Sequence, residues 1–187
     1  NSKEKVLVSL MHGNNEIGTL LPIKEVGEVC KSYKAYFHSD TVQTIAHYPF
    51  NLVELNIDFL PCSAHKFHGP KGVGFMYIKA GAPYNTLIHG AKNVMGGKRG
   101  GSLYNNGVAA MAMAVEIANI NLSFIEQTTQ KLRNRLEDEL LKIPDTKSYV
   151  PRNKRLKNLV AISFRGVEGE SMLWDMNQNS IYISTGS

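Results

Sequence analysis

The sequence has little cysteine, no long uninterrupted hydrophobic run and no strong excess of one charge. Its two cysteines, Cys30 and Cys62, cannot form a disulfide framework, which favours a reducing compartment. No stretch approaches the roughly 20 apolar residues of a membrane helix, so no membrane span is expected. The 21 Lys and Arg against 16 Asp and Glu are weak evidence for an anionic partner, which a bound phosphate would satisfy. The composition excludes disordered and collagen-like classes and is typical of a globular protein.

Short apolar segments alternate along the chain with segments of helical periodicity. Strands are predicted over residues 6–11, 35–39, 57–63, 75–78, 159–164 and 181–184, and helices from Pro22 onward, over 106–143 and over 168–178. This alternation predicts an α/β fold with a mostly parallel sheet and flanking helices. Pro61 disfavours regular pairing in its strand.

Polar residues near Asn119–Ser123 interrupt the longest helical pattern and suggest a bend between two domains. We therefore expect part of a large domain over residues 1–121 and the start of a smaller α+β domain over residues 122–187. The chain begins and ends almost directly on predicted strands, which normally need covered edges. A fragment of a larger protein is the expectation.

Three polar clusters follow predicted strands, where ligands bind in parallel α/β sheets. They are His12–Glu16, His38–Gln43 and Ser63–Lys66. A carbonyl cofactor requires a lysine amine for a Schiff base, and pyridoxal phosphate also requires a carboxylate at its pyridinium nitrogen. Lys66 and Asp40 are the natural candidates for these two tasks.

Other side chains in the clusters suit the remaining groups of that cofactor. Ser63 and His65 can donate to a phosphate, and Asn15 and Gln43 can donate to the phenolic oxygen of the ring. Each residue alone has a structural interpretation, because a single lysine is usually solvated and a single aspartate at a strand end usually caps a turn. Only the joint occurrence favours a cofactor site.

The histidines have simpler interpretations. His12, His47 and His89 are expected to be hydrogen-bonded structural residues. His65 and His68 lack a third ligand at metal-binding spacing, so no metal site is predicted.

Five segments resemble the cysteine desulfurases of the class V aminotransferase family. They are VSLMHGNNEIGTLLPI, FHSDTVQ, FLPCSAHKFHGPKGVGFMYI, KRGGSLYN and GVEGES followed by ISTGS. The pattern SxHKxxGPxGxG is highly specific, and the segments occur in the family order. The resemblance implies a fold-type-I enzyme that uses pyridoxal 5'-phosphate to convert L-cysteine to L-alanine, leaving the sulfur as a persulfide on an enzyme cysteine.

The resemblance also implies roles for individual residues. Lys66 would be the Schiff-base lysine and Asp40 the partner of the pyridine nitrogen; Gln43 and Asn15 would bond the phenolic oxygen, and Ser63 and His65 the phosphate. Ser102 would reach the phosphate in the neighbouring subunit, which implies a homodimer. A sulfur acceptor or iron–sulfur scaffold protein would be a further partner, and the expected location is cytoplasmic.

The sequence departs from this family in several places. The family's first third, its nucleophilic cysteine and its substrate-carboxylate arginine have no counterpart here, so the chain alone is expected to be inactive. Cys30 and Cys62 do not match the nucleophile, and buried thiols are usually inert. The segment His89–Arg99 differs at Lys92, Asn93 and Val94 from the family's glycine-rich pattern.

Other functions remain open at this point. A selenocysteine lyase or an aminotransferase of the same family would share Lys66 and Asp40. The basic run Arg152–Lys157 is typical of a nucleic-acid-binding surface, although it lacks interleaved aromatic residues and is also typical of a solvated loop. A non-catalytic scaffold is the third alternative. No nucleic-acid or membrane partner is expected.

Overall fold

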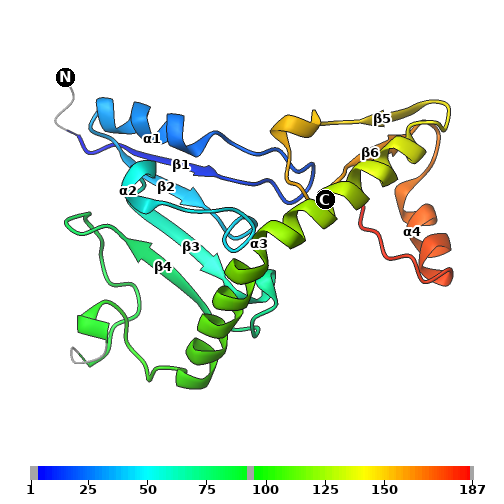
Figure 1. Cartoon of the computed structure of the whole chain (residues 1–187). Coiled ribbons are helices and arrows are strands. Elements are labelled where there is room, and N and C mark those ends of the chain that lie inside the picture. The colour runs from blue at the N-terminus through cyan, green and yellow to red at the C-terminus, as the bar shows by residue number, and fades with distance from the viewer. Residues whose placement is uncertain (1–3, 92–94, 186–187) are drawn as a thin grey trace. The chain divides into compact units, whose positions relative to one another are not determined.

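A computed structural model describes residues 4–91 and 95–185 (Figure 1). The chain folds into two compact units. The N-terminal unit comprises residues 1–12 and 21–123, and the C-terminal unit comprises residues 13–20 and 124–187. The domain boundary expected at residue 121 stays a prediction. The departures from the family pattern at Lys92, Asn93 and Val94 lie outside the described residues.

The N-terminal unit is built on a mixed four-stranded sheet. Its strands, in spatial order, are β1 (Leu7–Met11), β2 (Tyr36–Asp40), β3 (Phe59–Ser63) and β4 (Gly74–Ile78). The pairs β1–β2 and β2–β3 are parallel, and β3–β4 is antiparallel. The predicted α/β class with a mostly parallel sheet is confirmed.

Two helices of this unit pack on a common core. Helix α1 (Ile23–Ser32) buries Ile23, Gly27 and Cys30, which share one face at the spacing of an amphipathic helix. The short α2 (Leu52–Leu55) lies so close to α1 that a Cβ on Gly27 would approach the Leu55 carbonyl oxygen to 2.1 Å. Only a residue without a side chain fits there.

Pro61 affects β3 on one side only. The β3–β4 ladder runs through Pro61 without interruption, whereas β2 and β3 share a single paired position, His38 with Phe59. Proline cannot donate a backbone hydrogen bond. Its carbonyl oxygen accepts instead from the Thr41 hydroxyl at 2.7 Å, which joins the ends of β2 and β3.

Helix α3 (Asn105–Leu140) is one continuous helix of 36 residues. The polar side chains near Asn119–Ser123 fit the helix; Asn121 Nδ2, for example, donates to the Ile117 carbonyl oxygen at 2.8 Å. The bend predicted there stays a prediction. Within the described chain, α3 is long and apolar enough to cross a membrane, contrary to the sequence expectation. Core helices of water-soluble proteins have the same length and composition, so the feature alone does not identify a span.

The C-terminal unit contains a two-stranded antiparallel sheet. Its strands are β5 (Thr146–Ser148) and β6 (Ile162–Phe164), followed by α4 (Gly169–Gln178). The strand predicted over 181–184 is wrong. Ile181 N–H donates to the Met176 carbonyl oxygen at 3.0 Å, so the backbone there terminates α4 instead of joining a sheet.

The segment 13–20 belongs to the C-terminal unit although it follows β1 in the chain. Leu20 N–H donates to the Lys154 carbonyl oxygen, and Leu156 N–H donates to the Gly18 carbonyl oxygen, at 2.9 and 2.8 Å. Gly18 has a φ of +81°, and a Cβ there would approach Arg155 Cγ to 2.9 Å. These contacts fasten the segment to the short 3₁₀ turn Arg152–Lys154 and the residues that follow it.

Candidate functional site

The candidate site lies where the parallel strands of the N-terminal unit end. Asp40 is the last residue of β2 and is paired with Met11, the last residue of β1, while Ser63 is the last residue of β3. Parallel strands present their carboxyl ends at the same edge of a sheet. Two of the three predicted clusters, those with Asp40 and Ser63, therefore start from one edge.

Asp40 is half-buried, and both its backbone carbonyl and its carboxylate accept hydrogen bonds. The His12 N–H donates to the Asp40 carbonyl oxygen at 2.8 Å, and the Val42 N–H donates to Asp40 Oδ1 at 2.9 Å. The bond from Val42 N–H is the turn-capping interaction expected of a single aspartate at a strand end. It also holds the carboxylate in a defined orientation, which a partner for a cofactor nitrogen requires.

Lys66 lies on a short 3₁₀ helix, Ala64–Phe67, directly after β3. Ala64 and Phe67 are buried in a small core with Cys62 and Met111, whereas His65 and Lys66 are exposed. The buried side chains of Ala64 and Phe67 anchor the turn to this core. Its two basic side chains are consequently presented outward, as a binding role requires.

The loop after β2 connects Asp40 to the lysine turn through hydrogen bonds. Thr41 donates to the Pro61 carbonyl oxygen, and His47 Nε2 lies 3.0 Å from the Lys66 carbonyl oxygen. The structure therefore ties the segments that carry Asp40 and Lys66 to each other. The sequence predicts His47 only as a hydrogen-bonded structural residue and does not indicate its bond to the lysine turn.

His12 supports the same loop from the end of β1. Its Nδ1 lies 2.9 Å from Thr44 Oγ1, and its ring contacts the rings of Tyr48 and Phe50. Burial lowers the pKa of His12 from 6.5 to about 4, because the surroundings do not solvate an imidazolium. His12 is therefore neutral at pH 7, and its bond to Thr44 agrees with the predicted hydrogen-bonded structural residue.

The other predicted cofactor residues occupy different places. Gln43 is half-buried in the loop after β2, and Ser102 is exposed in the stretch before α3. Asn15 belongs to the C-terminal unit, in a turn where Asn14 Oδ1 accepts from the backbone of Glu16 and Ile17, each at 2.9 Å. The roles of Gln43, Ser102 and Asn15 stay predictions.

Both cysteines are buried free thiols. Burial raises the pKa of the Cys62 thiol to about 11, and burial followed by the nearby Asp58 carboxylate raises the pKa of Cys30. The thiolate is the reactive form of cysteine. These environments therefore keep both thiols protonated and unreactive.

The basic run of the C-terminal unit is engaged in internal ion pairs. Glu137 forms ion pairs with Arg152 and Arg155, the latter at 2.8 Å, and Lys157 pairs with Glu126. The hydrogen bond from Arg155 is the largest of the causes that lower the pKa of Glu137 to about 2. A run in which three of the four basic side chains are paired in this way is poorly suited to binding nucleic acid.

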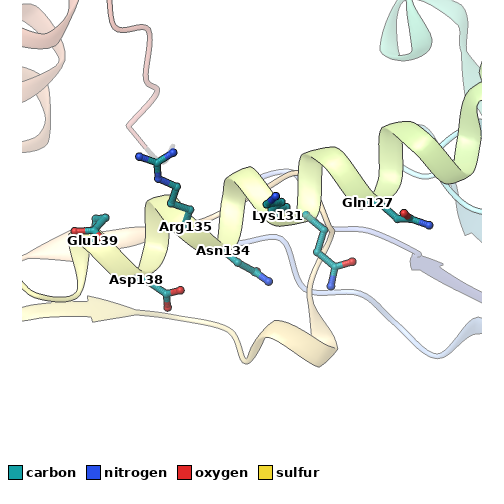
Figure 2. Close-up of a pocket in the computed structure, with 7 residues that line it drawn as sticks. Gln127, Lys131, Asn134, Arg135, Asp138 and Glu139 are labelled. Carbon is teal, nitrogen blue, oxygen red and sulfur yellow. The ribbon is translucent and has the colours of Figure 1, made fainter.

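A shallow hollow lies along α3 in the C-terminal unit (Figure 2). Side chains of both charges and neutral amides line it: Gln127, Gln130, Lys131, Asn134, Arg135, Asp138 and Glu139. None of the predicted cofactor residues is among them. The hollow is a mixed polar surface of one helix and is separate from the lysine turn in sequence.

The mixed sheet with parallel strands and flanking helices defines the fold class of the N-terminal unit, and comparison with known proteins identifies the family. The aminotransferase class-V model matches residues 2–187, so the chain belongs to that family, whose members depend on pyridoxal phosphate. The match covers almost every residue of the chain.

Curated relatives agree with this assignment. The chain is 45% identical over 187 residues to the cysteine desulfurase IscS of Clostridium botulinum, covering 98% of this chain and 47% of that protein. It is 43% identical over 184 residues to the cysteine desulfurase IscS of Methanosarcina thermophila, covering 98% and 45%.

Solved structures agree as well. A NifS-like protein superposes with a TM-score of 0.92 at 37% identity, covering 99% of this chain and 51% of that one. A NifS-like protein from Rickettsia africae gives a TM-score of 0.91 at 30% identity, covering 98% and 51%. The fold is therefore that of NifS-like fold-type-I structures. The chain spans about half the length of these proteins.

Proposed function

We propose that the chain is part of a pyridoxal-phosphate-dependent cysteine desulfurase. The observation that supports this most directly is the pair of hydrogen bonds that tie the loop after Asp40 to the end of β3 and to the Lys66 turn. An amine and a carboxylate held on two connected segments are the minimum that the coenzyme needs. The similarity to cysteine desulfurases supplies the reaction.

The residues present fit pyridoxal phosphate by their chemistry. Lys66 offers an exposed amine for the aldehyde carbon, and the half-buried Asp40 offers a carboxylate that can keep the pyridine nitrogen protonated. Ser63 and His65 precede Lys66 in the chain and would donate to the phosphate, and Gln43 lies on the loop after Asp40. When bound, the coenzyme supplies an electron sink for the carbanion of an amino acid.

The remaining assignments concern residues outside this cluster. We propose that Asn15, like Gln43, donates to the phenolic oxygen, and that Ser102 binds the phosphate of a second subunit in a homodimer. L-cysteine is the proposed substrate, with L-alanine and a persulfide as products. Neither Cys30 nor Cys62 is the sulfur carrier, because both thiols are buried and their pKa values are raised.

The protein is proposed to act in the cytoplasm, passing sulfur to an acceptor such as an iron–sulfur scaffold protein. In this proposal α3 is a core helix of a water-soluble enzyme. Its superposition, with nearly the whole chain, on two NifS-like structures supports that interpretation. A salt-dependent affinity for nucleic acid would contradict the proposal, and the ion pairs of the basic run argue against it.

The Lys66 assignment is tested by Lys66→Ala in the protein loaded with coenzyme. We expect the protein-bound coenzyme absorbance near the visible edge to disappear, because the covalent attachment is lost. Lys71→Ala removes an exposed lysine five residues away and serves as the control. An unchanged spectrum in Lys66→Ala contradicts the assignment.

The Asp40 assignment is tested by comparing Asp40→Asn with Asp40→Ala. Asparagine keeps an oxygen for the Val42 N–H but removes the charge, whereas alanine removes both. In the full-length protein, turnover of L-cysteine should fall at least about 100-fold in both variants, since the electron sink needs a protonated pyridine. Normal turnover in Asp40→Asn with unchanged folding eliminates the proposed role.

The products separate the proposed reaction from the alternatives within the family. Alanine and persulfide sulfur from L-cysteine indicate a desulfurase. Preference for selenocysteine indicates a lyase of that substrate, and amino transfer to a keto acid indicates an aminotransferase. Failure of the protein to bind pyridoxal phosphate favours a non-catalytic scaffold.

A further inference from the structure

The carbonyl group of Lys66 has an unusual environment at the end of its 3₁₀ helix. Terminal carbonyls of a helix lack partners within the helix and must find them elsewhere. The backbone donor three residues on, Gly69 N–H, is bonded to the Ala64 carbonyl oxygen at 2.9 Å. The residue four positions on is Pro70, which has no N–H. Neither of the usual backbone donors serves Lys66.

His47 supplies the hydrogen bond instead. Its Nε2 lies 3.0 Å from the Lys66 carbonyl oxygen, and because a carbonyl only accepts, Nε2 carries the proton and donates. Both the protonated ring and the neutral tautomer with hydrogen on Nε2 can donate in this way. The contact therefore does not require one charge state.

The position of His47 is fixed by the loop that starts at Asp40. Thr41 and Thr44 are fully buried, and the carbonyl oxygen of each accepts a backbone hydrogen bond from the third residue after it, Thr44 N–H at 2.9 Å and His47 N–H at 3.0 Å. Ala46 has a φ of +63°, which turns the chain just before His47. A continuous set of short bonds thus runs from Asp40 to the imidazole.

We propose that His47 is a positioning residue that holds the backbone of Lys66 in register with Asp40. The inference rests on the proposed function, in which Lys66 and Asp40 hold opposite parts of one coenzyme. Without the bond, the lysine turn would be held by the buried side chains of Ala64 and Phe67 and by the bond from Ala64 N–H to the Val73 carbonyl oxygen, none of which involves Lys66. The amine would then sample more positions relative to the carboxylate, and the coenzyme would bind less tightly.

The test compares His47→Gln with His47→Met. The two side chains are similar in length, but glutamine carries an N–H donor and methionine carries none. In coenzyme-free protein, amide hydrogen exchange of residues 64–69 should accelerate about three- to tenfold in His47→Met and return close to the wild-type rate in His47→Gln. His47→Phe, which keeps a ring without a donor, replaces His47→Met if that variant does not fold.

The coenzyme readout is the dissociation constant of pyridoxal phosphate. We expect it to rise about three- to tenfold in His47→Met and to be restored in His47→Gln. Asn121→Met is the matched control, because Asn121 Nδ2 also donates to a backbone carbonyl oxygen, that of Ile117, but within α3 and not on the lysine turn. This variant should leave the exchange of residues 64–69 and the dissociation constant unchanged.

The outcomes separate this inference from the proposed function. Unchanged exchange in His47→Met overturns the inference, and so does faster exchange with unchanged coenzyme affinity, which would make His47 merely structural. If wild-type protein binds no pyridoxal phosphate, or Lys66→Ala retains its absorbance, the proposed function fails whatever His47 does. Faster exchange, weaker binding and rescue by glutamine together support the inference.

Discussion

The two units hold distant parts of the chain together with different chemistry. In the N-terminal unit, the strand ends around Asp40 are joined by the neutral groups of Thr41, Thr44 and His12, with His47 beside them. In the C-terminal unit, Glu137 joins α3 to the basic run through charged groups, and the Arg155 side chain in this cluster has no exposed surface.

The difference shows where each unit is vulnerable. A buried hydrogen bond between neutral groups contributes about 0.5–1.5 kcal/mol, and leaving one of its partners unsatisfied costs about 1–3 kcal/mol. A buried ion pair contributes little net stability against an apolar replacement, but removing one partner leaves an uncompensated charge. The C-terminal unit should therefore be the more sensitive to single substitutions in its cluster.

Acid should act on the two units over different ranges of pH. The pKa of His12 is lowered in the folded state, so the unfolded state takes up the proton first, and stability falls as the pH drops from 6.5 to about 4. The pKa of Glu137 is lowered from 4.5 to about 2, so its contribution is present above pH 4.5 and is lost as the pH falls toward 2. The N-terminal unit should loosen first.

The largest expected effect is that of Glu137→Gln. Glutamine leaves the buried Arg155 guanidinium without a countercharge, which should destabilise the C-terminal unit by about 3–5 kcal/mol. Urea unfolding followed by hydrogen exchange in residues 133–156 measures this loss. Glu139→Gln removes an exposed ion pair to Lys142 and should cost less than about 1 kcal/mol. Equal losses in the two variants would remove the contrast between the units.

The next effect is acid destabilisation of the N-terminal unit through His12. Between pH 7 and pH 4.5 the free energy of unfolding of this unit should fall by about 2.5 kcal/mol, from the shift of the His12 pKa to about 4. Hydrogen exchange in β1 and β2 at several pH values measures it. His12→Gln should flatten this dependence. A slope that persists in the variant shows that another group carries it.

The smallest effect is a stabilisation by Ala46→Gly. Ala46 has a φ of +63°, where a Cβ is strained and glycine is not, so relief of strain should exceed the entropy gained by the unfolded chain. We expect a gain of about 0.5–1 kcal/mol in thermal or urea unfolding. The same change at Ala114, inside α3, should destabilise by a similar amount. A loss at position 46 would show that the loop is not strained there.

Local patterns were sufficient to predict the fold of the N-terminal unit. Alternating apolar segments predicted β1 to β4 to within two residues at each boundary, and the polar residues after β2 and β3 located Asp40 and Lys66 at strand ends. The signals work because each strand and the loop after it are contiguous in sequence. The family resemblance, not the periodicity, predicted the roles of individual residues.

Long-range contacts were not predictable in the same way. Strand β5 has three residues and little apolar character, and its pairing with β6 depends on the fold of the whole unit. Only one local feature of the sequence hints at the bond from His47 to Lys66. It is Pro70, four residues after the lysine, which has no backbone N–H to donate to the Lys66 carbonyl oxygen. That signal shows that a donor is needed but does not say which residue supplies it.

The assignment of residues 13–20 to the C-terminal unit has a consequence for biosynthesis. On the ribosome this segment emerges more than 100 residues before Lys154 and Leu156, the residues that bind its backbone. The strands of the N-terminal sheet can associate before residues 154–156, which bind segment 13–20, have been synthesised. Completion of the C-terminal unit is therefore a late event, and premature termination of synthesis would leave Asn15 on an unanchored loop.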